Sequence, residues 1–282
     1  MVKVINAGFY TTIQDLGRFG FQQFGVPVSG VMDSYSAKVA NALLHNNEND
    51  AVLEITMSRL TLQFNCDTCI CIAGADISPK LNNKLVKLNS ILNIKKGDIL
   101  SFGKLIYGYR CYLAVSGGFQ TEIRMNSRSM YKSITTQFVL AKNDELAILE
   151  HDNIFEKSNA SIKINTNHFG LNDIEVLKGP EFELLTKKQQ KQLLSNKFTL
   201  SKDNNRMAYQ LVEVLENNIK PIITSLVLPG TVQLTPSGKL IVLMRDCQTT
   251  GGYPRVLQLK EYSIDVLSQK LVGNNIHFLL KS

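Results

Sequence analysis

Short runs of alternating or β-branched residues recur along this chain at spacings of about ten residues, and this spacing limits the possible folds most. The N-terminal half contains LTLQFN, CICIAG and LVKLN, which are separated by turn residues such as LNNK. A later run, YGYRCYLAVSGG, ends in paired glycines. Short, evenly spaced strands are typical of β-barrels and β-sandwiches. The sequence therefore predicts a mainly β fold.

Few segments have the pattern of a helix. Asp33 or Ser34 can cap a helix through SAKVANALL that ends before Asn46. Pro180 can open a second helix, EFELLTKKQQKQLL, that closes at Asn196. Within ILNIKKGDILSFG, the residues Lys-Lys-Gly-Asp predict a hairpin turn.

A polar stretch, HDNIFEKSNASIKINTN, begins at residue 151 and has the composition of a linker. A new strand and helix pattern, IEVLKGPEF, follows it. We therefore expect two domains, residues 1–165 and residues 166–282.

Composition narrows the function classes. The chain has 282 residues, of which 44% are hydrophobic and 20% are charged, as is usual for a soluble protein. Its beginning lacks the apolar core of a signal peptide, and no apolar run approaches the roughly 20 residues of a membrane helix. We expect a cytoplasmic protein with no membrane partner. The net charge of +7 comes mainly from scattered lysines without a recognisable module, so no nucleic-acid partner is expected.

The cysteines do not indicate a metal site. There are five of them, and CDTCIC lacks the second Cys or His pair of a structural zinc site. CICIAG instead has the pattern of a buried strand in which cysteine serves as a small apolar residue. We expect no bound metal.

Polar side chains gather in the glycine-rich segment TTIQDLGRFGFQQFGVPVSG, which we interpret as a long ordered loop. Gln14, Asp15 and Arg18 supply an amide, a carboxylate and a guanidinium. These groups can bind a carboxylate, an amide or a phosphate of a ligand. Alternatively, Asp15 and Arg18 bond each other and fix the loop.

A second polar cluster, DCQTTGGYPR, follows the apolar run KLIVLMR. The two glycines allow a tight turn with accessible N–H groups. Arg255 can pair with a carboxylate or phosphate of a ligand. If the strand that contains Gln233 pairs with the strand before this cluster, Gln233 would face the same groove as the cluster. The alternative is a polar turn whose groups bond one another. The candidate residues around the turn are Gln233, Asp246, Gln248, Thr249, Thr250, Gly251, Gly252, Tyr253 and Arg255.

Motifs throughout the chain closely resemble a family of biotin-dependent carboxyltransferase-like proteins that includes the C subunit of 5-oxoprolinase and relatives of urea amidolyase and allophanate hydrolase. The similar stretches are TTIQDLGRFG, GVPVSGVMD, LEIT, IAGAD, GYRCYLAVSGG, SRS, LPGTVQLTPSGKLIVLMRDCQTTGGYPRV and LSQKLVGNNIHF. The resemblance implies a pair of cyclophilin-like β-barrel domains with a few helices, and a site in the groove between them. We expect Asp15, Asp246 and Arg255 to be catalytic residues, and the expectation for Arg255 rests on its chemistry more than on the resemblance. The expected substrate-binding residues are Gln14, Arg18, Arg128, Gln233 and residues 248–253.

The function that the resemblance implies is a subunit of an ATP-dependent 5-oxoprolinase. Together with subunits A and B, it would open 5-oxo-L-proline to L-glutamate, and it would be inactive alone. No GxxxxGK[ST] phosphate loop occurs in the sequence, so we expect no cofactor on this chain alone and ATP with magnesium in the complex. The alternatives are a biotin-dependent carboxyltransferase with a urea-like acceptor, and a non-enzymatic regulator that binds a kinase-inhibitor-like B subunit.

Two segments depart from the family pattern. Ser127-Arg128-Ser129 is followed by Met130 and YKSITTQFVLAKNDEL, which lacks the family's glycines and arginine. The Arg-Met-Gly-x-Arg element appears as Arg206-Met-Ala-Tyr-Gln. Fewer cations would weaken the binding of an anionic ligand.

Overall fold

The computed structural model describes residues 1–57, 59–150 and 163–281. They form two compact units, one of Met1–Arg18 with Ser29–Thr166 and one of Phe19–Val28 with Asn167–Ser282. The division after Thr166 falls beside the boundary expected near residue 165, but the assignment of Phe19–Val28 to the second unit was not expected. The proposed linker at 151–167 lies mostly outside the described residues.

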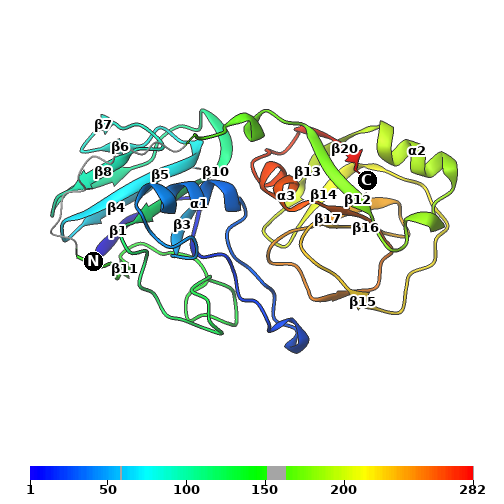
Figure 1. Cartoon of the computed structure of the whole chain (residues 1–282), viewed down its shortest axis with the longest axis horizontal. Coiled ribbons are helices and arrows are strands. Elements are labelled where there is room, and N and C mark those ends of the chain that lie inside the picture. The colour runs from blue at the N-terminus through cyan, green and yellow to red at the C-terminus, as the bar shows by residue number, and fades with distance from the viewer. Residues whose placement is uncertain (58, 151–162, 282) are drawn as a thin grey trace. The chain divides into compact units, whose positions relative to one another are not determined.

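The described residues of the first unit form two antiparallel sheets and the helix α1 (Ser34–Leu43) (Figure 1). One sheet has the order β11-β1-β4-β9-β6-β7 and the other has the order β2-β3-β10-β5-β8. The strands are β1 (Val2–Ala7), β2 (Tyr10–Gln14), β3 (Val52–Thr56), β4 (Leu60–Phe64), β5 (Thr68–Asp76), β6 (Lys80–Leu81), β7 (Lys84–Leu85), β8 (Ile91–Ile94), β9 (Ile99–Ser101), β10 (Tyr107–Val115) and β11 (Glu145–Leu146).

Apolar side chains of both sheets form the core of the first unit. Leu62, Phe64, Ile72 and Leu113 belong to it and are completely buried. On the other side of β5 and β10, the helix α1 (Ser34–Leu43) forms a second apolar cluster with these strands. Strands β5 and β10 therefore have apolar neighbours on both faces, which explains why CICIAG, in β5, is continuously apolar.

The helix α1 begins as the sequence predicts. The side chain of Asp33 accepts a hydrogen bond from the backbone N–H of Ser36 at 2.9 Å, which makes Asp33 the N-cap. Cys69 and Cys71 lie buried in β5, so the interpretation of CDTCIC as part of a buried strand is confirmed for these two residues.

Two local predictions were wrong. The stretch that begins TTIQ is not wholly a loop, because Tyr10–Gln14 pairs with β3 as the strand β2. The turn Lys95–Asp98 is not a hairpin turn either, because β8 pairs with β5 whereas β9 pairs with β4 and β6. This turn carries the chain from one sheet to the other.

The second unit is built on a closed barrel with the order β12-β19-β16-β17-β14-β13-β20. The strands are β12 (Asp173–Lys178), β13 (Lys197–Asn204), β14 (Ala208–Val214), β16 (Thr231–Leu234), β17 (Lys239–Leu243), β19 (Arg255–Leu259) and β20 (Asn275–Leu280). A separate two-stranded sheet joins β15 (Ser225–Leu226) to β18 (Thr250–Gly251). The mainly β prediction is confirmed, and the described strands close into a barrel in this unit.

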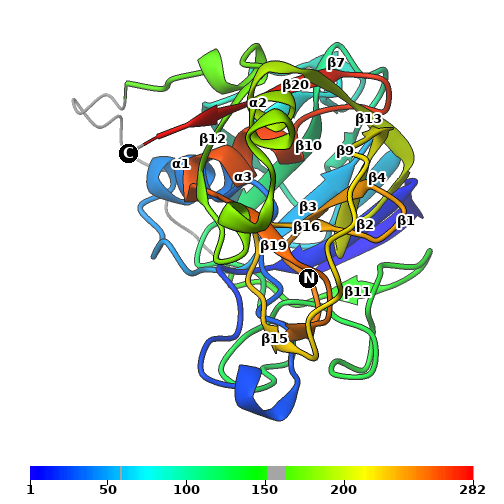
Figure 2. The same ribbon diagram turned by 90° about the vertical axis from the view of Figure 1, so that its right-hand side faces the viewer.

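Helix α2 (Lys187–Ser195) packs on β20, and helix α3 (Glu261–Ser268) packs on β12 (Figure 2). The predicted helix from Pro180 is divided into a 3-10 turn at Phe182–Leu184 and α2, which Thr186 caps. Its predicted end at Asn196 is confirmed. Further 3-10 turns occur at Gln22–Phe24 and Asn167–Phe169. Among the described residues, no helix has the length and apolar character that a membrane span requires.

Candidate functional site

The polar turn after β17 lies over the outer face of the barrel. Gln233 lines a cavity on this face, and its neighbours Val232 and Leu234, which are buried and do not line the cavity, point to the opposite face of the strand. Gln233 is nevertheless only 2% exposed, because the turn covers it. A Cβ added to Gly251 would lie 2.5 Å from Gln233 Nε2, and glycine at 251 is what allows this close approach.

A cavity of about 550 Å³ opens between this outer face and the turn. Its volume is within the range of about 300–1,000 Å³ that is common for small-molecule sites. Gln233, Gln248 and Tyr253 all line this cavity, which lies within the second unit. The other lining residues are Lys202, Asp203, Asn204, Asn205, Met207, Ala208, Gln210, Ile241 and Leu243. The expected site in a groove between the two domains stays a prediction.

Two amide groups of this cavity have unsatisfied hydrogen-bonding atoms. Gln233 Nε2 is a donor and Gln248 Oε1 is an acceptor, and both atoms are buried without a hydrogen-bond partner. A buried polar group without a partner costs about 1–3 kcal/mol. A ligand that supplies one acceptor and one donor would recover this free energy.

A small apolar cluster supports the turn. Val227, Leu243 and Cys247 are buried together, and Ile241 packs against them. Burial raises the pKa of the Cys247 thiol to about 12, so this cysteine is a packing residue and not a nucleophile near neutral pH.

The carboxylate of Asp246 is bound by an arginine of the same chain. Its two oxygens accept hydrogen bonds from Arg206 Nε at 2.8 Å and from Arg206 Nη2 at 3.0 Å. Asp246 is 9% exposed and Arg206 is 5% exposed. The pair joins the start of the turn to the segment before β14, which gives Asp246 a structural function in this conformation.

Arg255 also has a partner within the chain. Its Nε and Nη2 donate to the two carboxylate oxygens of Glu181 at 2.9 and 2.8 Å, and its Nη1 donates to the Leu226 carbonyl oxygen at 2.9 Å. The planar fork that was expected to hold a substrate carboxylate therefore holds Glu181. A catalytic function of Arg255 or Asp246 stays a prediction.

Gly179 places Glu181 against Arg255. A Cβ at Gly179 would lie 2.1 Å from the carbonyl oxygen of Arg255, so no other residue fits there without a shift of the backbone. The N–H of Arg255 also donates to Glu181 at 2.8 Å. Glu181, in the segment after Pro180, thus fixes the end of the turn through its hydrogen bonds with Arg255.

We expect Glu181→Gln to destabilise the second unit in a pH-dependent manner. Hydrogen bonds from the side chain of Arg255 hold the pKa of Glu181 below its ordinary value of 4.5. A lowered carboxyl pKa contributes stability above the unfolded value, and this contribution is lost as the pH falls through the folded value. Near neutral pH the variant should lose about 2 kcal/mol, the contribution of hydrogen bonds to a charged group.

Urea unfolding at several pH values, followed by circular dichroism, measures this difference. The gap between the original chain and Glu181→Gln should shrink as the pH falls below 4.5. A gap of the same size at neutral and acidic pH would show that the charge of Glu181 does not stabilise the unit.

The other residues of the turn fix its path. The Thr249 carbonyl oxygen accepts from Val227 N at 3.1 Å, and the Gly252 carbonyl oxygen accepts from Ile222 N at 3.0 Å. Thr250 and Gly251 form β18. Tyr253 is 40% exposed at the cavity. The glycines and threonines therefore act through their backbone, while Gln233, Gln248 and Tyr253 offer side chains to a ligand.

In the first unit, Asp15 organises the Ser-Arg-Ser segment. Its carboxylate accepts hydrogen bonds from Ser127 Oγ at 2.7 Å, Ser129 Oγ at 2.6 Å, Arg128 N at 2.6 Å and Gly17 N at 2.9 Å. Asp15 is only 4% exposed. Four donors around one carboxylate indicate that it fixes two loops against each other. Its catalytic function stays a prediction.

Gln14 and Arg18 are completely buried in this conformation. Gln14 Nε2 donates to Thr12 Oγ1 at 3.0 Å and to the Met130 carbonyl oxygen at 3.2 Å, and Arg18 Nη2 donates to the Ser129 carbonyl oxygen. Both side chains therefore hold the same segment as Asp15 does. A ligand would reach them only after a rearrangement.

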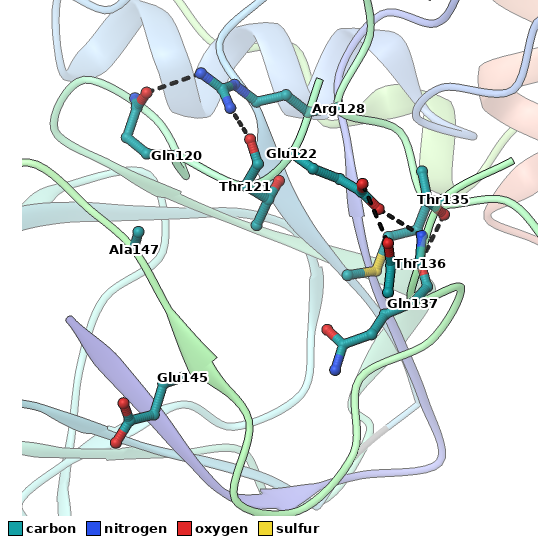
Figure 3. A pocket seen from close by; sticks show the side chains of 10 residues that line it. Gln120, Thr121, Glu122, Arg128, Thr135, Thr136, Gln137, Glu145 and Ala147 are labelled. Atoms are coloured by element: carbon teal, nitrogen blue, oxygen red, sulfur yellow. Dashed lines mark hydrogen bonds between the residues drawn. The ribbon is translucent and has the colours of Figure 1, made fainter. Parts of the chain in front are cut away.

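Arg128 lies at a second cavity, of about 350 Å³, in the first unit. Figure 3 shows its guanidinium bonded to Gln120 and to the backbone of Thr121, while Glu122 bonds Thr136 on another wall. Residues 135–137, which belong to the segment that departs from the family pattern, line this cavity. The residues that differ from the family pattern therefore form part of the wall of this cavity.

Sequence reasoning missed several residues of the cavity in the second unit. Gln210 and Ile241 lie opposite each other on adjacent strands and line it together. Their positions alternate with the buried residues Tyr209, Leu211, Leu240 and Val242. The alternation was visible in the sequence, but a polar residue facing away from a barrel interior is ordinarily a surface residue.

Comparison with known proteins places the whole chain in one family. Residues 24–280 match the family described as carboxyltransferase domain, subdomain A and B. The C subunit of the Escherichia coli 5-oxoprolinase is 34% identical over 285 residues, which are 99% of this chain and 91% of that protein. The crystal structure of the Kluyveromyces lactis urea amidolyase covers all of this chain with a TM-score of 0.87 and 26% identity, but this chain spans only 19% of that much longer protein. The urea amidolyase of Lachancea kluyveri is 38% identical over 130 residues, 46% of this chain and 7% of that protein.

Proposed function

Because the chain belongs to the family of carboxyltransferase domains with subdomains A and B, we propose that it is one component of a multi-chain 5-oxoprolinase. One observation carries this proposal: the similarity to the C subunit of the E. coli 5-oxoprolinase extends over 99% of this chain and 91% of that protein. The similarity therefore extends over nearly the whole length of both proteins, whereas this chain corresponds to a small part of a urea amidolyase.

The proposed reaction is the hydrolytic opening of a lactam. Water adds to the carbonyl carbon, the C–N bond of the ring breaks, the carbonyl becomes a carboxylate and the ring nitrogen becomes the amine of glutamate. The lactam amide is stabilised by resonance, and ATP would activate it by transferring its γ-phosphoryl group to the carbonyl oxygen. ADP leaves in that transfer, and inorganic phosphate is released when the carboxylate forms. The chain has no GxxxxGK[ST] loop, so we assign ATP and magnesium to the companion subunits A and B.

This chain would hold and orient the lactam. A donor that points at the carbonyl oxygen stabilises the negative charge that develops there, and fixed positions of the reacting groups lower the entropic barrier. The cavity beside Gln233 and Gln248 offers such groups. Lys202 is the one cation among the described residues that line it, and it can face the carboxylate of the substrate.

A second candidate is a biotin-dependent carboxyltransferase. The family description and the similarity to a urea amidolyase support it. The ureido ring of biotin also presents a carbonyl oxygen and an N–H group, so the same cavity could accept it. In that reaction a carboxyl group would pass from biotin to an acceptor, and no lactam would be opened.

The test is reconstitution with the companion subunits. We expect the chain with subunits A and B to form glutamate from 5-oxo-L-proline and to release ADP, with both products absent for the chain alone. Lactam-dependent ATP hydrolysis by the purified single chain would contradict the proposal, and so would an assembled complex that forms no glutamate. A biotinylated carrier protein, tested with the same preparation, distinguishes the second candidate.

We further propose that the chain forms a stable complex with the B subunit of the enzyme. Co-expression followed by size exclusion should give one peak that contains both chains. Two separate peaks at micromolar concentration would contradict this association. If the complex forms but has no activity on either substrate, the third possibility, a non-enzymatic regulator of the B subunit, would gain support.

A further inference from the structure

The cavity in the second unit contains an unusual combination of groups. Its lining is rich in side-chain amides, namely Asn204, Asn205, Gln210, Gln233 and Gln248. The charged lining residues, Lys202 and Asp203, are both exposed at its rim. The buried part of the cavity therefore offers neutral hydrogen-bonding groups and apolar surface, and it suits a neutral polar group of a ligand.

Two of these amides are already engaged through their oxygen atoms. Asn204 Oδ1 accepts from Gln210 N at 3.1 Å, and Asn205 Oδ1 accepts from Met207 N at 2.8 Å. Gln233 Nε2 and Gln248 Oε1 have no partner. Among the buried side-chain atoms of the described lining residues, one donor and one acceptor, carried by two different residues, thus lack a partner.

A secondary amide within a small ring offers one acceptor and one donor, the two groups that Gln233 Nε2 and Gln248 Oε1 lack. The ring forces the amide into the cis form, so the C=O and the N–H point to the same side of the molecule. An acyclic secondary amide is trans and directs them to opposite sides. We propose that Gln233 Nε2 donates to the carbonyl oxygen of a small cyclic amide and that Gln248 Oε1 accepts from its N–H. This assignment rests on the proposed function and names the groups that recognise the lactam.

The turn has to move for the ligand to enter. The backbone of Gly251 lies directly on Gln233 Nε2, since a Cβ at residue 251 would be 2.5 Å from that atom. The turn is held by the short pairing of β15 with β18 and by the bonds of Thr249 and Gly252 to the segment 222–227. We infer that this segment of the turn lifts, admits the ring and closes on it.

A binding experiment with matched ligands tests the assignment. The protein, alone and in complex with its companion subunits, is titrated by calorimetry with 2-pyrrolidinone, N-methyl-2-pyrrolidinone and 5-oxo-L-proline. The N-methyl compound keeps the carbonyl and lacks the N–H. The original chain should prefer 2-pyrrolidinone by about tenfold or more, since leaving a buried acceptor unpaired costs about 1–3 kcal/mol and 1.4 kcal/mol is tenfold.

The variants separate the two hydrogen bonds. Gln248→Ala should bring the preference for 2-pyrrolidinone close to one, and Gln233→Ala should weaken both pyrrolidinones about equally, by roughly tenfold. Gly251→Ala should resemble Gln233→Ala, because the added Cβ displaces the amide of Gln233. Gln192→Ala, an exposed glutamine of α2, is the matched control and should leave both affinities unchanged.

The ratio of the two affinities is informative because general damage to the fold would weaken both ligands together. No binding of any cyclic amide by the original chain would overturn the proposal, and so would a ratio that Gln248→Ala leaves unchanged. If the complex hydrolyses 5-oxo-L-proline while the ratio stays unchanged, only the assignment of the amides fails. If a cyclic urea binds through both glutamines while 5-oxo-L-proline is neither bound nor hydrolysed, the 5-oxoprolinase function fails and the amide pair stands.

Discussion

Asp15→Ala is expected to lower the free energy of unfolding of the first unit by about 3–5 kcal/mol, because single hydrogen bonds to a charged group contribute about 1.5–3 kcal/mol. The substitution removes the acceptor of Ser127 Oγ, Ser129 Oγ and two backbone N–H groups, all of which point at the Asp15 carboxylate. With Asp15 only 4% exposed, water cannot replace it without opening the loops.

Hydrogen exchange followed by mass spectrometry can localise this effect to residues 127–130. The control is Glu48→Ala, which removes an exposed ion pair with Lys38 and should cost less than about 1 kcal/mol. Equal stability of the two variants would contradict the structural function of Asp15. A variant Asp15→Asn that folds normally and lacks activity in the assembled complex would instead support the catalytic function expected from the sequence.

Asp246→Ala is expected to destabilise the second unit by about 3–5 kcal/mol, the range in which removal of one partner of a buried ion pair falls. The guanidinium of Arg206 is 5% exposed and loses both hydrogen bonds to the carboxylate. The turn that carries Gln248 should also become less ordered, because Asp246 is its first residue.

Urea unfolding of Asp246→Ala and of the double variant Arg206→Met with Asp246→Leu checks this prediction. The double variant should regain most of the loss, because neither charge of this pair remains. Asp173→Ala is the control, since its carboxylate is largely exposed near His277. A double variant as unstable as Asp246→Ala would show that the loss comes from packing and not from the charge.

The polar clusters illustrate how far the sequence allows prediction. It indicated that a polar turn follows the apolar run of β17, because the end of an apolar run is a local property, and it placed Gln233 beside this turn only on the condition that the strands pair. It could not indicate that Arg255 binds Glu181, 74 residues earlier, or that Asp246 binds Arg206, 40 residues earlier. The residue type determines which hydrogen bonds a side chain can form, but the fold determines which partner lies close enough to form them.

The same limit appears in the regular elements. The capping of α1 by Asp33 follows from four consecutive residues and was predicted. The start of α2 was misplaced although Thr186 and Gln189 form a capping box, because Pro180 is also a favourable helix start. Competing local signals of similar strength are decided by packing.

The sequence by itself determined the mainly β architecture, the cap of α1 and the turn at Lys95–Asp98, because each depends on neighbouring residues and on backbone preferences. Only the tertiary structure decided that this turn joins two different sheets, that Asp15 holds the Ser-Arg-Ser segment, and that Gln233 and Gln248 keep unpaired groups at one cavity. The physical reason is that strand partners and buried hydrogen bonds are chosen among residues far apart in the chain. Their free energies depend on distance and burial in the folded molecule, and neither quantity is present in a local pattern.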